Sequence, residues 1–550
     1  MTISSNKLVI LAILDGWGIA PDSPGNAITQ SSTPNMSMFQ KKYPNTTLTA
    51  SGEFVGLPRG EDGNTETGHL NIGAGLVVYQ DLERISMSIA EGSFFSNEVL
   101  NKALDHAIQF NSNLHLIGLL GAGGVHSKIE HLFALLRLAK TKDFKNVFVH
   151  VFTDGRDTPP TSANIYIAKL NEVIKKEGVG KIASVIGRYW AMDRNERWSR
   201  TAKAYFALTK GAGRLVKSTN EAIKSSYQTG ITDEFIEPSL VAEDEKPIAL
   251  IKENDAVIFF NFRIDRPRQL TKAFLLDDMK MAAKEKGFDP HLVEYEQTHI
   301  SKKNNKLDEP FDRGEKIKNL YFVGMTEYDK PLVETGLKVA FPPIMVDNPL
   351  GKVISDANLN QLRITESEKE RFVTFYFNGL REQPFPNEDR IIIPSPDVAT
   401  YDLKPEMSSH EITDTLIRKM QEKNYSLAVI NYPNADMIGH TGSIGPAVRA
   451  IEAVDKQLGK LAGFAYSYDA TLIITSDHGN AEEMIDLSTG AISTDHTANK
   501  VPLIIVSNKF QDRKIDLKPG ILSDIAPTIL SILDLKIPKE MTGRNLLEPV

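Results

Sequence analysis

Six Asp and His residues stand beside short hydrophobic runs of this 550-residue chain, where an open α/β sheet would place its ligand crevice. Any one of them alone would be read as a helix cap or a hydrogen-bonded surface residue. Together they offer oxygen and nitrogen donors, a mixed set that suits Mn²⁺, Zn²⁺ or Mg²⁺. Six donors exceed the needs of one catalytic ion with an open position, so we expect two ions, an arrangement suited to phosphoryl transfer. The six residues are Asp15, Asp436, His440, Asp477, His478 and His496.

Asp436 and His440 are four residues apart, a spacing that places both on one face of a helix. Pro433 and Gly439 weaken that helix, so a loop is equally compatible with the segment.

Two hydroxyls, on Thr65 and Thr67, lie in the glycine-rich segment from Gly60 to His69. Glycines permit a tight turn whose backbone comes close to a ligand. A hydroxyl in such a turn becomes nucleophilic only if its pKa is lowered, which a metal ion would do. Without a metal, the segment would be an ordinary surface turn.

Arginines form the third chemical signal, because several of them follow hydrophobic runs. Planar guanidinium groups at strand ends suit bidentate capture of carboxylate or phosphate. Each of them alone could equally be an exposed side chain paired with a neighbouring Asp. The arginines are Arg156, Arg188, Arg194, Arg263 and Arg266, and Asp157 follows the first of them.

Short β-branched runs bounded by polar turns predict buried strands, and amphipathic stretches such as 129–140 and 165–176 predict helices between them. This alternation favours α/β layers around largely parallel sheets. The predicted strands are 8–14, 114–120, 147–152, 182–186, 256–260, 372–377, 427–431, 471–475 and 503–506.

Composition excludes several classes of protein. The chain has no cysteine, which rules out disulfides, thiolate nucleophiles and cysteine-ligated metals. Its net charge of −8 argues against a broad nucleic-acid-binding or membrane-binding surface. The first hydrophobic run lacks the features of a signal peptide, and no run reaches the roughly 20 apolar residues of a membrane helix. We therefore expect a cytoplasmic protein.

The polar stretch 280–318, rich in Lys, Glu and Asn, is the strongest compositional break in the chain. Composition alone predicts a domain boundary near residue 310.

These blocks together resemble the cofactor-independent phosphoglycerate mutases of the alkaline phosphatase superfamily. The resemblance extends nearly to the C-terminus. The remaining matching stretches are 11–18, 70–75, 79–82, 123–127, 368–369, 434–442 and 476–482.

The resemblance implies two three-layer α/β domains with largely parallel sheets, one inserted into the other. The discontinuous, phosphatase-like domain would comprise residues 1–79 and 336–550, and the inserted phosphotransferase domain residues 80–335. It also implies a role for each matched residue. One metal ion would be bound by Asp436, His440 and His496, and the other by Asp15, Thr65, Asp477 and His478. The substrate would contact His126, Arg156, Asp157, Arg188, Arg194, Arg263, Arg266 and Lys369.

The implied reaction is the interconversion of 3-phosphoglycerate and 2-phosphoglycerate in glycolysis and gluconeogenesis. Thr65 would be the nucleophile that forms a phosphoenzyme, Asp157 the general base and acid, and Lys369 a catalytic cation. Closure of the two domains would exclude water. The expected cofactors are two divalent ions, Mn²⁺ before Mg²⁺, Co²⁺ or Zn²⁺. The resemblance favours a monomer with a small-molecule substrate, and neither a nucleic acid nor a membrane is expected as a partner.

One departure from the family pattern concerns the nucleophile, because the family carries Ser where this chain has Thr65. The extra methyl group restricts χ1 and crowds the attack geometry. Two alternatives stay open. Since the metal ligands are shared across the superfamily, the chain could be another of its enzymes, such as a phosphopentomutase or phosphatase. Because of Thr65, it could also be a catalytically impaired phosphoglycerate-binding protein.

Overall fold

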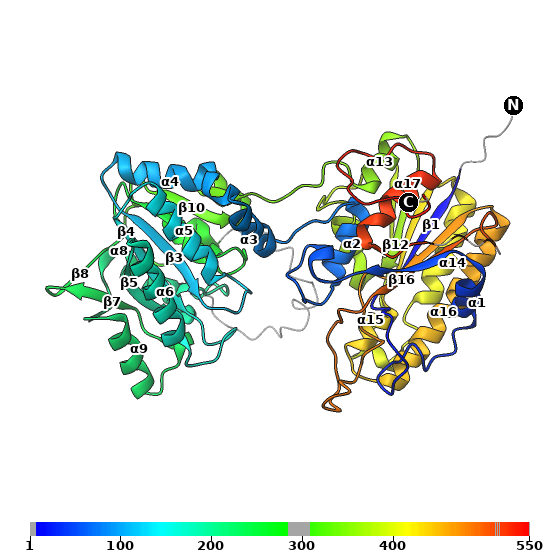
Figure 1. Cartoon of the computed structure of the whole chain (residues 1–550), viewed down its shortest axis with the longest axis horizontal. Helices are drawn as coiled ribbons and strands as arrows, with labels where there is room; N and C mark the ends of the chain where they lie inside the picture. The colour runs from blue at the N-terminus through cyan, green and yellow to red at the C-terminus, as the bar shows by residue number, and fades with distance from the viewer. Residues whose placement is uncertain (1–6, 284–307, 512, 514, 516, 549–550) are drawn as a thin grey trace. The chain divides into compact units, whose positions relative to one another are not determined.

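The computed structural model describes residues 7–283, 308–511, 513, 515 and 517–548. The chain divides into two compact units. Unit 1 comprises Met1–Gln80 and Ile344–Val550, and unit 2 comprises Asp81–Pro343. Each unit contains one largely parallel sheet, so the expected α/β class is confirmed (Figure 1).

The sheet of unit 1 has eight strands in the described part of the chain. Its first five are parallel, and β16 pairs antiparallel with both β15 and β2. In spatial order the strands are β13 (Glu388–Ile393), β12 (Gln361–Glu366), β14 (Leu427–Tyr432), β1 (Val9–Leu14), β15 (Thr471–Thr475), β16 (Val501–Val506), β2 (Asn45–Thr49) and β17 (Gly520–Ile521).

Strand β1 shows why helices cover both faces of this sheet, since all six of its residues are buried. Ile10, Ala12 and Leu14 pack with α1, α14, α15 and α16, whereas alternate residues of the strand pack with α2, α13 and α17. Figure 1 shows α14 and α16 running beside the sheet. The helices are α1 (Pro34–Lys42), α2 (Thr65–Ala74), α13 (Leu350–Asp356), α14 (Ser409–Glu422), α15 (Asn434–Gly439), α16 (Ile444–Ser467) and α17 (Ile525–Ile532).

The sheet of unit 2 has nine strands among the described residues, and β8 (Lys246–Pro247) pairs only at its edge, with β7. Six neighbouring strands from β11 to β5 are parallel. In spatial order the strands are β11 (Lys338–Phe341), β10 (Tyr321–Thr326), β9 (Ala256–Phe259), β3 (Leu114–Leu120), β4 (Val147–Thr153), β5 (Lys181–Gly187), β7 (Ser239–Glu243) and β6 (Arg214–Val216).

Helices also cover both faces of the second sheet. Leu114 and Leu116 of β3 pack in the cluster that contains α4, α5, α6 and α9, and Ile117 and Leu119 pack in the cluster that contains α8 and α10. Each unit is therefore a three-layer sandwich with its own core. The helices are α3 (Asp81–Glu91), α4 (Glu98–Gln109), α5 (Ile129–Thr141), α6 (Ala163–Glu177), α7 (Arg188–Ala191), α8 (Trp198–Lys210), α9 (Thr219–Gln228), α10 (Pro267–Leu275) and α12 (Lys330–Glu334).

Two expectations from the sequence are wrong. The run 372–377 is not a strand but a π-helical turn, Phe372–Tyr376, in which the rings of Phe372 and Tyr376 stack with centroids 5.6 Å apart. The boundary near residue 310 is also wrong, because β10 and β11 follow the polar stretch and belong to the sheet of unit 2. Most of that stretch, residues 284–307, lies outside the described residues.

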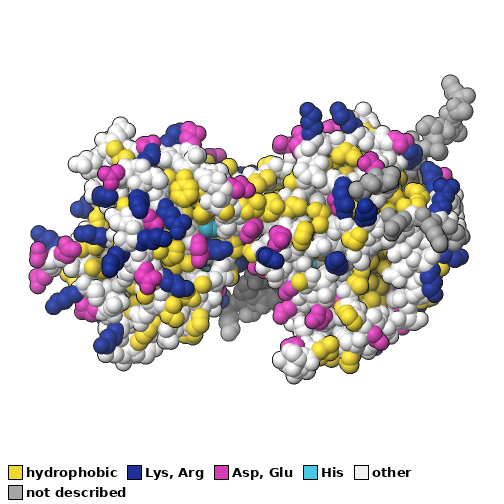
Figure 2. All heavy atoms as spheres, in the orientation of Figure 1, with side chains coloured by type: hydrophobic (Ala, Val, Ile, Leu, Met, Phe, Trp, Pro, Cys, Tyr) yellow, Lys and Arg dark blue, Asp and Glu magenta, His cyan; other side chains and the backbone are white. Residues whose placement is uncertain are grey.

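Within the described residues, no helix combines the length and the hydrophobicity needed to cross a membrane. On the face drawn in Figure 2, Lys and Arg side chains are interspersed with Asp and Glu side chains over both units. This mixture agrees with the modest net charge of −8.

Candidate active site

In unit 1, the expected site residues gather at one edge of the sheet. Parallel strands end at a common edge, and β16 begins there because it is antiparallel. Gly16 lets the chain turn tightly after β1: its φ is +75°, and a Cβ atom there would lie 2.7 Å from the Cα atom of Asp436. The residues are Asp15 after β1, Thr65 opening α2, Lys369 after β12, Asp436 and His440 on and after α15, Asp477 and His478 after β15, and His496 before β16.

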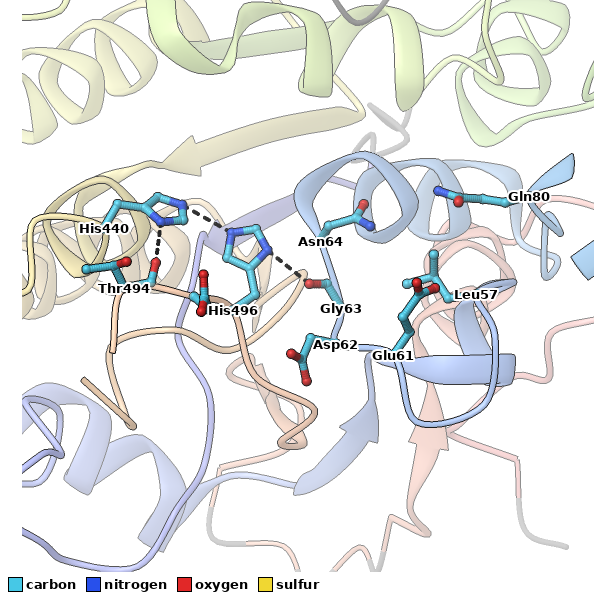
Figure 3. A pocket seen from close by; sticks show the side chains of 10 residues that line it. Leu57, Glu61, Asp62, Gly63, Asn64, Gln80, His440, Thr494 and His496 are labelled. Atoms are coloured by element: carbon cyan, nitrogen blue, oxygen red, sulfur yellow. Dashed lines mark hydrogen bonds between the residues drawn. The ribbon is translucent and has the colours of Figure 1, made fainter. Parts of the chain in front are cut away.

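The first donor group consists of Asp436, His440 and His496. Figure 3 shows the two histidines side by side. Each histidine has its Nδ1 atom against a backbone carbonyl, that of Thr494 at 2.7 Å for His440 and that of Gly63 at 3.0 Å for His496. These carbonyls require a proton on Nδ1 and leave Nε2 as a lone pair. The two Nε2 atoms lie 3.2 Å apart, and each is 3.2 Å from Asp436 Oδ1. Three acceptor atoms thus converge on one point, the geometry of a cation site.

The second donor group surrounds His478, whose ring is fully buried. Its Nδ1 atom faces the carbonyl of Gly479 at 3.2 Å, so Nε2 faces the site. Nε2 lies 2.9 Å from Thr65 Oγ1, 3.3 Å from Asp15 Oδ1 and 3.6 Å from Asp477 Oδ2. A ring nitrogen, two carboxylates and a hydroxyl form a mixed donor set of the kind that Zn²⁺ and Mn²⁺ accept.

Thr65 is held at the N-terminus of α2, where unpaired backbone N–H groups favour an anion. Asn64 caps the helix by accepting a hydrogen bond of 2.9 Å from the backbone N–H of Thr67. The Nζ atom of Lys369 donates to Thr65 Oγ1 at 3.1 Å. The hydroxyl therefore sits between a cationic side chain and the donor atoms of the second group.

Lys369 is almost fully buried and carries the positive charge of the cluster. Its Nζ atom lies 2.9 Å from Asp15 Oδ1 and 2.7 Å from Asp436 Oδ2. Burial alone would lower the pKa of the ammonium group, but the two carboxylates raise it above its usual value. The side chain is therefore cationic at neutral pH.

The residues of unit 1 fit divalent metal ions, because within the described part of the chain three buried carboxylates, Asp15, Asp436 and Asp477, are accompanied by a single ammonium group, that of Lys369, which contacts the first two. Such an excess of buried negative charge requires further cations. The same demand appears at His478: burial lowers the pKa of the ring, but Asp477 and the other carboxylates raise it to about 10. A bound cation would satisfy this demand without the extra proton.

A cavity of about 540 Å³ opens beside the first donor group. Figure 3 shows His440 and His496 on one side of it, with Asp62, Gly63 and Asn64 nearby. The cavity gives a small molecule access to the donor atoms of unit 1.

In unit 2, the expected substrate residues also follow the carboxyl ends of parallel strands. His126 and Asp157 line a narrow cleft together with the glycine-rich loop that begins at Gly121. The residues are His126 after β3, Arg156 and Asp157 after β4, Arg188 and Arg194 after β5, and Arg263 and Arg266 between β9 and α10.

Arg188 is fully buried, and its Nη1 atom donates to Asp154 Oδ1 and to Asp157 Oδ2, both at 2.6 Å. Burial would raise the pKa of the Asp157 carboxyl, but the hydrogen bond from Arg188 holds it below its usual value. Asp157 is therefore a carboxylate at neutral pH and can accept a proton.

Asp265 brings three of the expected residues together: Arg194, Arg263 and His126 all have a side-chain nitrogen within 3.5 Å of its carboxylate. Arg156 stands apart, because its side chain is 56% exposed and lies 3.9 Å from Glu234.

Comparison with known proteins identifies the family to which the chain belongs. Residues 85–330 match the family model described as the BPG-independent PGAM N-terminus. The chain is 49% identical to a 2,3-bisphosphoglycerate-independent phosphoglycerate mutase of Clostridium kluyveri. The alignment covers 98% of this chain and 99% of that protein. The chain belongs to the 2,3-bisphosphoglycerate-independent phosphoglycerate mutases.

Two further members of the phosphoglycerate mutases extend the comparison. A relative from Moorella thermoacetica is 46% identical over 100% of this chain and 99% of its own. A solved structure of Leishmania mexicana phosphoglycerate mutase at low cobalt concentration is 28% identical, with a TM-score of 0.60, and covers 99% of this chain and 98% of its own. The family expected from the sequence motifs is therefore confirmed along the whole chain.

Several residues near the site in this member of the family were not predicted from the sequence. Asn431 donates from Nδ2 to Asp15 Oδ2 at 2.8 Å. His69 lies 3.1 Å from Asp477 Oδ2 and could have been found, because it is four residues after Thr65 and so shares its helix face. The positions of Asp154 and Asp265 had no comparable signal, since nothing in the sequence says which acids are buried among the arginines.

Proposed function

We propose that this chain interconverts 3-phosphoglycerate and 2-phosphoglycerate without a bisphosphoglycerate primer. As a member of its family it is an isomerase of the intramolecular phosphotransferase class. The observation that carries the proposal is the Thr65 hydroxyl, which lies 3.1 Å from Lys369 Nζ and 2.9 Å from His478 Nε2 at the start of a helix. In phosphoryl transfer to this hydroxyl, the cation and the helix N-terminus would stabilise the negative charge of the phosphoryl oxygens.

In the proposed reaction, Thr65 Oγ1 gives up its proton and forms a bond to the substrate phosphorus while the bond from phosphorus to the glycerate oxygen breaks, and that oxygen takes up one proton to become a free hydroxyl of glycerate. In the return step the other glycerate hydroxyl gives up its proton and forms the bond to phosphorus, while the bond from phosphorus to Thr65 Oγ1 breaks and Thr65 regains a proton. Lys369 offsets the charge on the transferring oxygens. Two divalent ions, Mn²⁺ before Mg²⁺, Co²⁺ or Zn²⁺, would be held by the two donor groups and supply Lewis-acid charge at the phosphoryl group.

Unit 2 supplies the groups for the glycerate moiety. Asp157, a carboxylate held by Arg188, would take the hydroxyl proton and return it. Arg194, Arg263 and Arg266 would bind the anionic oxygens as planar forks. Both residue sets are needed for one reaction, and the phosphoenzyme must be protected from water.

The deciding experiment is an assay of 2-phosphoglycerate formation from 3-phosphoglycerate in the absence of added bisphosphoglycerate. We expect turnover with Mn²⁺ and none after treatment with EDTA. Release of inorganic phosphate instead of 2-phosphoglycerate would indicate a phosphatase. Substrate binding without turnover, under every metal tried, would indicate a binding protein.

The monomeric state and the cytoplasmic location are further parts of the proposal. Size-exclusion chromatography with light scattering tests the first against the chain mass of 61.0 kDa. Fractionation of the source cells tests the second.

A further inference from the structure

We propose that Asp265 is a positioning residue that holds Arg194, Arg263 and His126 in place for the substrate. The inference rests on the proposed function, because it assigns these three side chains to substrate binding. It adds a residue outside the expected substrate set.

The contacts of Asp265 are the first support. Its Oδ2 atom accepts a hydrogen bond of 2.6 Å from Arg194 Nη1, and its Oδ1 atom accepts one of 2.9 Å from the backbone N–H of Arg266. Oδ1 also lies 3.5 Å from Arg263 Nε and 3.5 Å from His126 Nδ1. All four partners belong to the expected substrate set.

Exposure supports a role in the site rather than in the core. The Asp265 side chain is only 5% exposed, whereas those of Arg194 and Arg263 are 41% and 39% exposed. A buried carboxylate thus anchors one end of two arginines whose other donors face solvent. Because the contact of Arg263 with Asp265 is made through Nε, its two terminal nitrogens stay available to form a fork to an anion.

Asp193, the residue before Arg194, shows that a buried acid of unit 2 need not make such contacts. Asp193 is equally buried, but its carboxylate accepts from the backbone N–H groups of Asn195 and Arg197 and lies 3.4 Å from Arg200. None of these is an expected substrate residue. Asp193 holds the fold of its loop, whereas Asp265 holds the substrate side chains.

Electrostatics explain why the cluster needs this acid. Burial and the nearby charges of Arg188 and Arg194 lower the pKa of Arg266 to about 10, a sign of mutual repulsion among the cations. Burial would raise the pKa of Asp265, but the charge of Arg263 and the hydrogen bond from Arg194 hold it below its usual value, so it is ionised. Its negative charge offsets the repulsion and keeps the donors converged before substrate arrives.

His126 gains a defined orientation from the same acid. Burial lowers the pKa of its ring to about 3, so the imidazole is neutral and carries one proton. Its Nδ1 atom faces Asp265, and its Nε2 atom lies 3.7 Å from Asp157 Oδ2. The contact with Asp265 is the shorter of the two, and Asp157 Oδ2 already accepts a hydrogen bond from Arg188, so we expect the proton on Nδ1 and the lone pair on Nε2.

The test is Asp265→Asn in the full-length, metal-loaded protein. We expect the KM for 3-phosphoglycerate to rise about tenfold or more, the scale of a lost hydrogen bond to a charged group, with unchanged metal content. The matched control is Asp233→Asn, another buried acid of unit 2, whose carboxylate accepts from the backbone of Ser162 and Ala163. It should lower stability and leave the KM within about twofold of wild type.

A double-mutant cycle separates positioning from general damage. If Asp265 acts through Arg194, adding Asp265→Asn to Arg194→Ala should raise the KM much less than it does in the wild-type background. A wild-type KM for Asp265→Asn, or effects that simply multiply, would overturn the inference. Failure of the wild-type protein to convert 3-phosphoglycerate would instead overturn the proposed function.

The wild-type protein gives a readout that does not depend on how the variant folds. Nitrogen-15 NMR of the imidazoles, with the His126 signals assigned by their loss in His126→Gln, reports which ring nitrogen bears the proton. We expect the Nδ1–H tautomer. The Nε2–H tautomer would contradict the role of Asp265 at this ring.

Discussion

Thr65 is the residue on which the proposed chemistry depends most directly. Its Oγ1 atom has three polar side chains around it, and its methyl group is the one feature that a serine would lack. The β-branched side chain restricts χ1, which fixes the hydroxyl but narrows the approach of a substrate.

Replacing Thr65 by Ala should reduce 2-phosphoglycerate formation by at least about a thousandfold, because no hydroxyl remains to accept the phosphoryl group. Thr65→Ser should stay within about tenfold of wild type, since it keeps the nucleophile. Mass spectrometry of acid-quenched protein should place the trapped phosphate on residue 65. As a control, Thr209→Ala removes a hydroxyl that, among the described residues, donates to the backbone carbonyl of Tyr205, and it should leave turnover unchanged. Phosphate on any other residue would refute the assignment.

The two donor groups predict separate losses of metal. His496→Ala should remove roughly one ion per chain from the first group, and His478→Ala roughly one from the second, because each loses a ring nitrogen at the point where the acceptors converge. Elemental analysis after dialysis measures the content. His410→Ala, which changes an exposed histidine of α14, should keep the full content. Unchanged content in both site variants would contradict the ligand assignment.

At this scale the sequence predicted the residue types well and the contacts poorly. Asp15 and Asp477 could be placed at strand ends because hydrophobic runs mark where strands stop. Asp154 and Asp265 could not be assigned, because burial and side-chain direction arise from tertiary packing. The segment that holds His69 also contains glycines, which hid the helix α2.

The element that positions the nucleophile is α2, and its N-cap offers a test at the scale of secondary structure. Asn64→Ala removes the acceptor of the Thr67 N–H and should cost about 1 kcal/mol of stability. It should also reduce turnover, because Thr65 is the first residue of the helix. Urea unfolding and the mutase assay measure the two effects. Ser218→Ala removes the equivalent cap of α9, through Glu221 N–H, and should lower stability alone. Equal effects of both variants on turnover would argue against a local role for the cap.

Helix α5 predicts a pH dependence, because it carries His131 in the core of unit 2. Burial lowers the pKa of this ring to about 3, below the 6.5 of an unfolded chain. The unfolded state therefore binds the proton first, so stability is complete above pH 6.5 and falls as the pH drops toward 3. From pH 7 to 5.5 the loss should be about 1 kcal/mol for this group.

The free energy of unfolding at the two pH values can be measured by urea unfolding. The signal is tryptophan fluorescence in a Trp17→Phe background. The remaining two of the three tryptophans, Trp190 and Trp198, both belong to unit 2. His131→Gln should weaken the acid sensitivity by about 1 kcal/mol. His106→Gln, at a partly exposed ring of α4, should not. The same acid sensitivity in His131→Gln and wild type would show that other groups cause it.

Most elements were predictable from periodicity, and the failures have a local cause. Strands 114–120 and 471–475 match β3 and β15 to the residue, since each is a short buried run between polar turns. The run 372–377 has the same composition but folds as a helical turn, because periodicity cannot separate strand from helix in six apolar residues. The sequence is compatible with either a helix or a loop at Asp436 and His440. In the structure, Asp436 lies on the short helix α15 and His440 directly follows it.

At the scale of the whole molecule, the donor groups belong to unit 1 alone, so metal removal should affect the units differently. A ligand stabilises the folded form that binds it, by about 2.7 kcal/mol at a concentration of 100 times Kd. Treatment with EDTA should lower the unfolding temperature of unit 1, measured by calorimetry. The unfolding temperature of unit 2, measured by the fluorescence of Trp190 and Trp198 in the Trp17→Phe background, should stay nearly unchanged. Adding Mn²⁺ back should reverse the shift. An equal shift in both units would show that they unfold as one.

Strand β1 lies between β14 and β15 in its sheet, although both partners come more than 400 residues later in the chain. At about 5 to 20 residues per second, a ribosome needs about 20 to 80 s to deliver Leu427 after Val9. Unit 2 is synthesised entirely within that interval and can fold first. The hydrophobic segment Val9–Leu14 therefore leaves the ribosome long before its partners exist. Until then the segment is exposed and accessible to chaperones. The sheet edge that carries Asp15 is completed only near the end of synthesis.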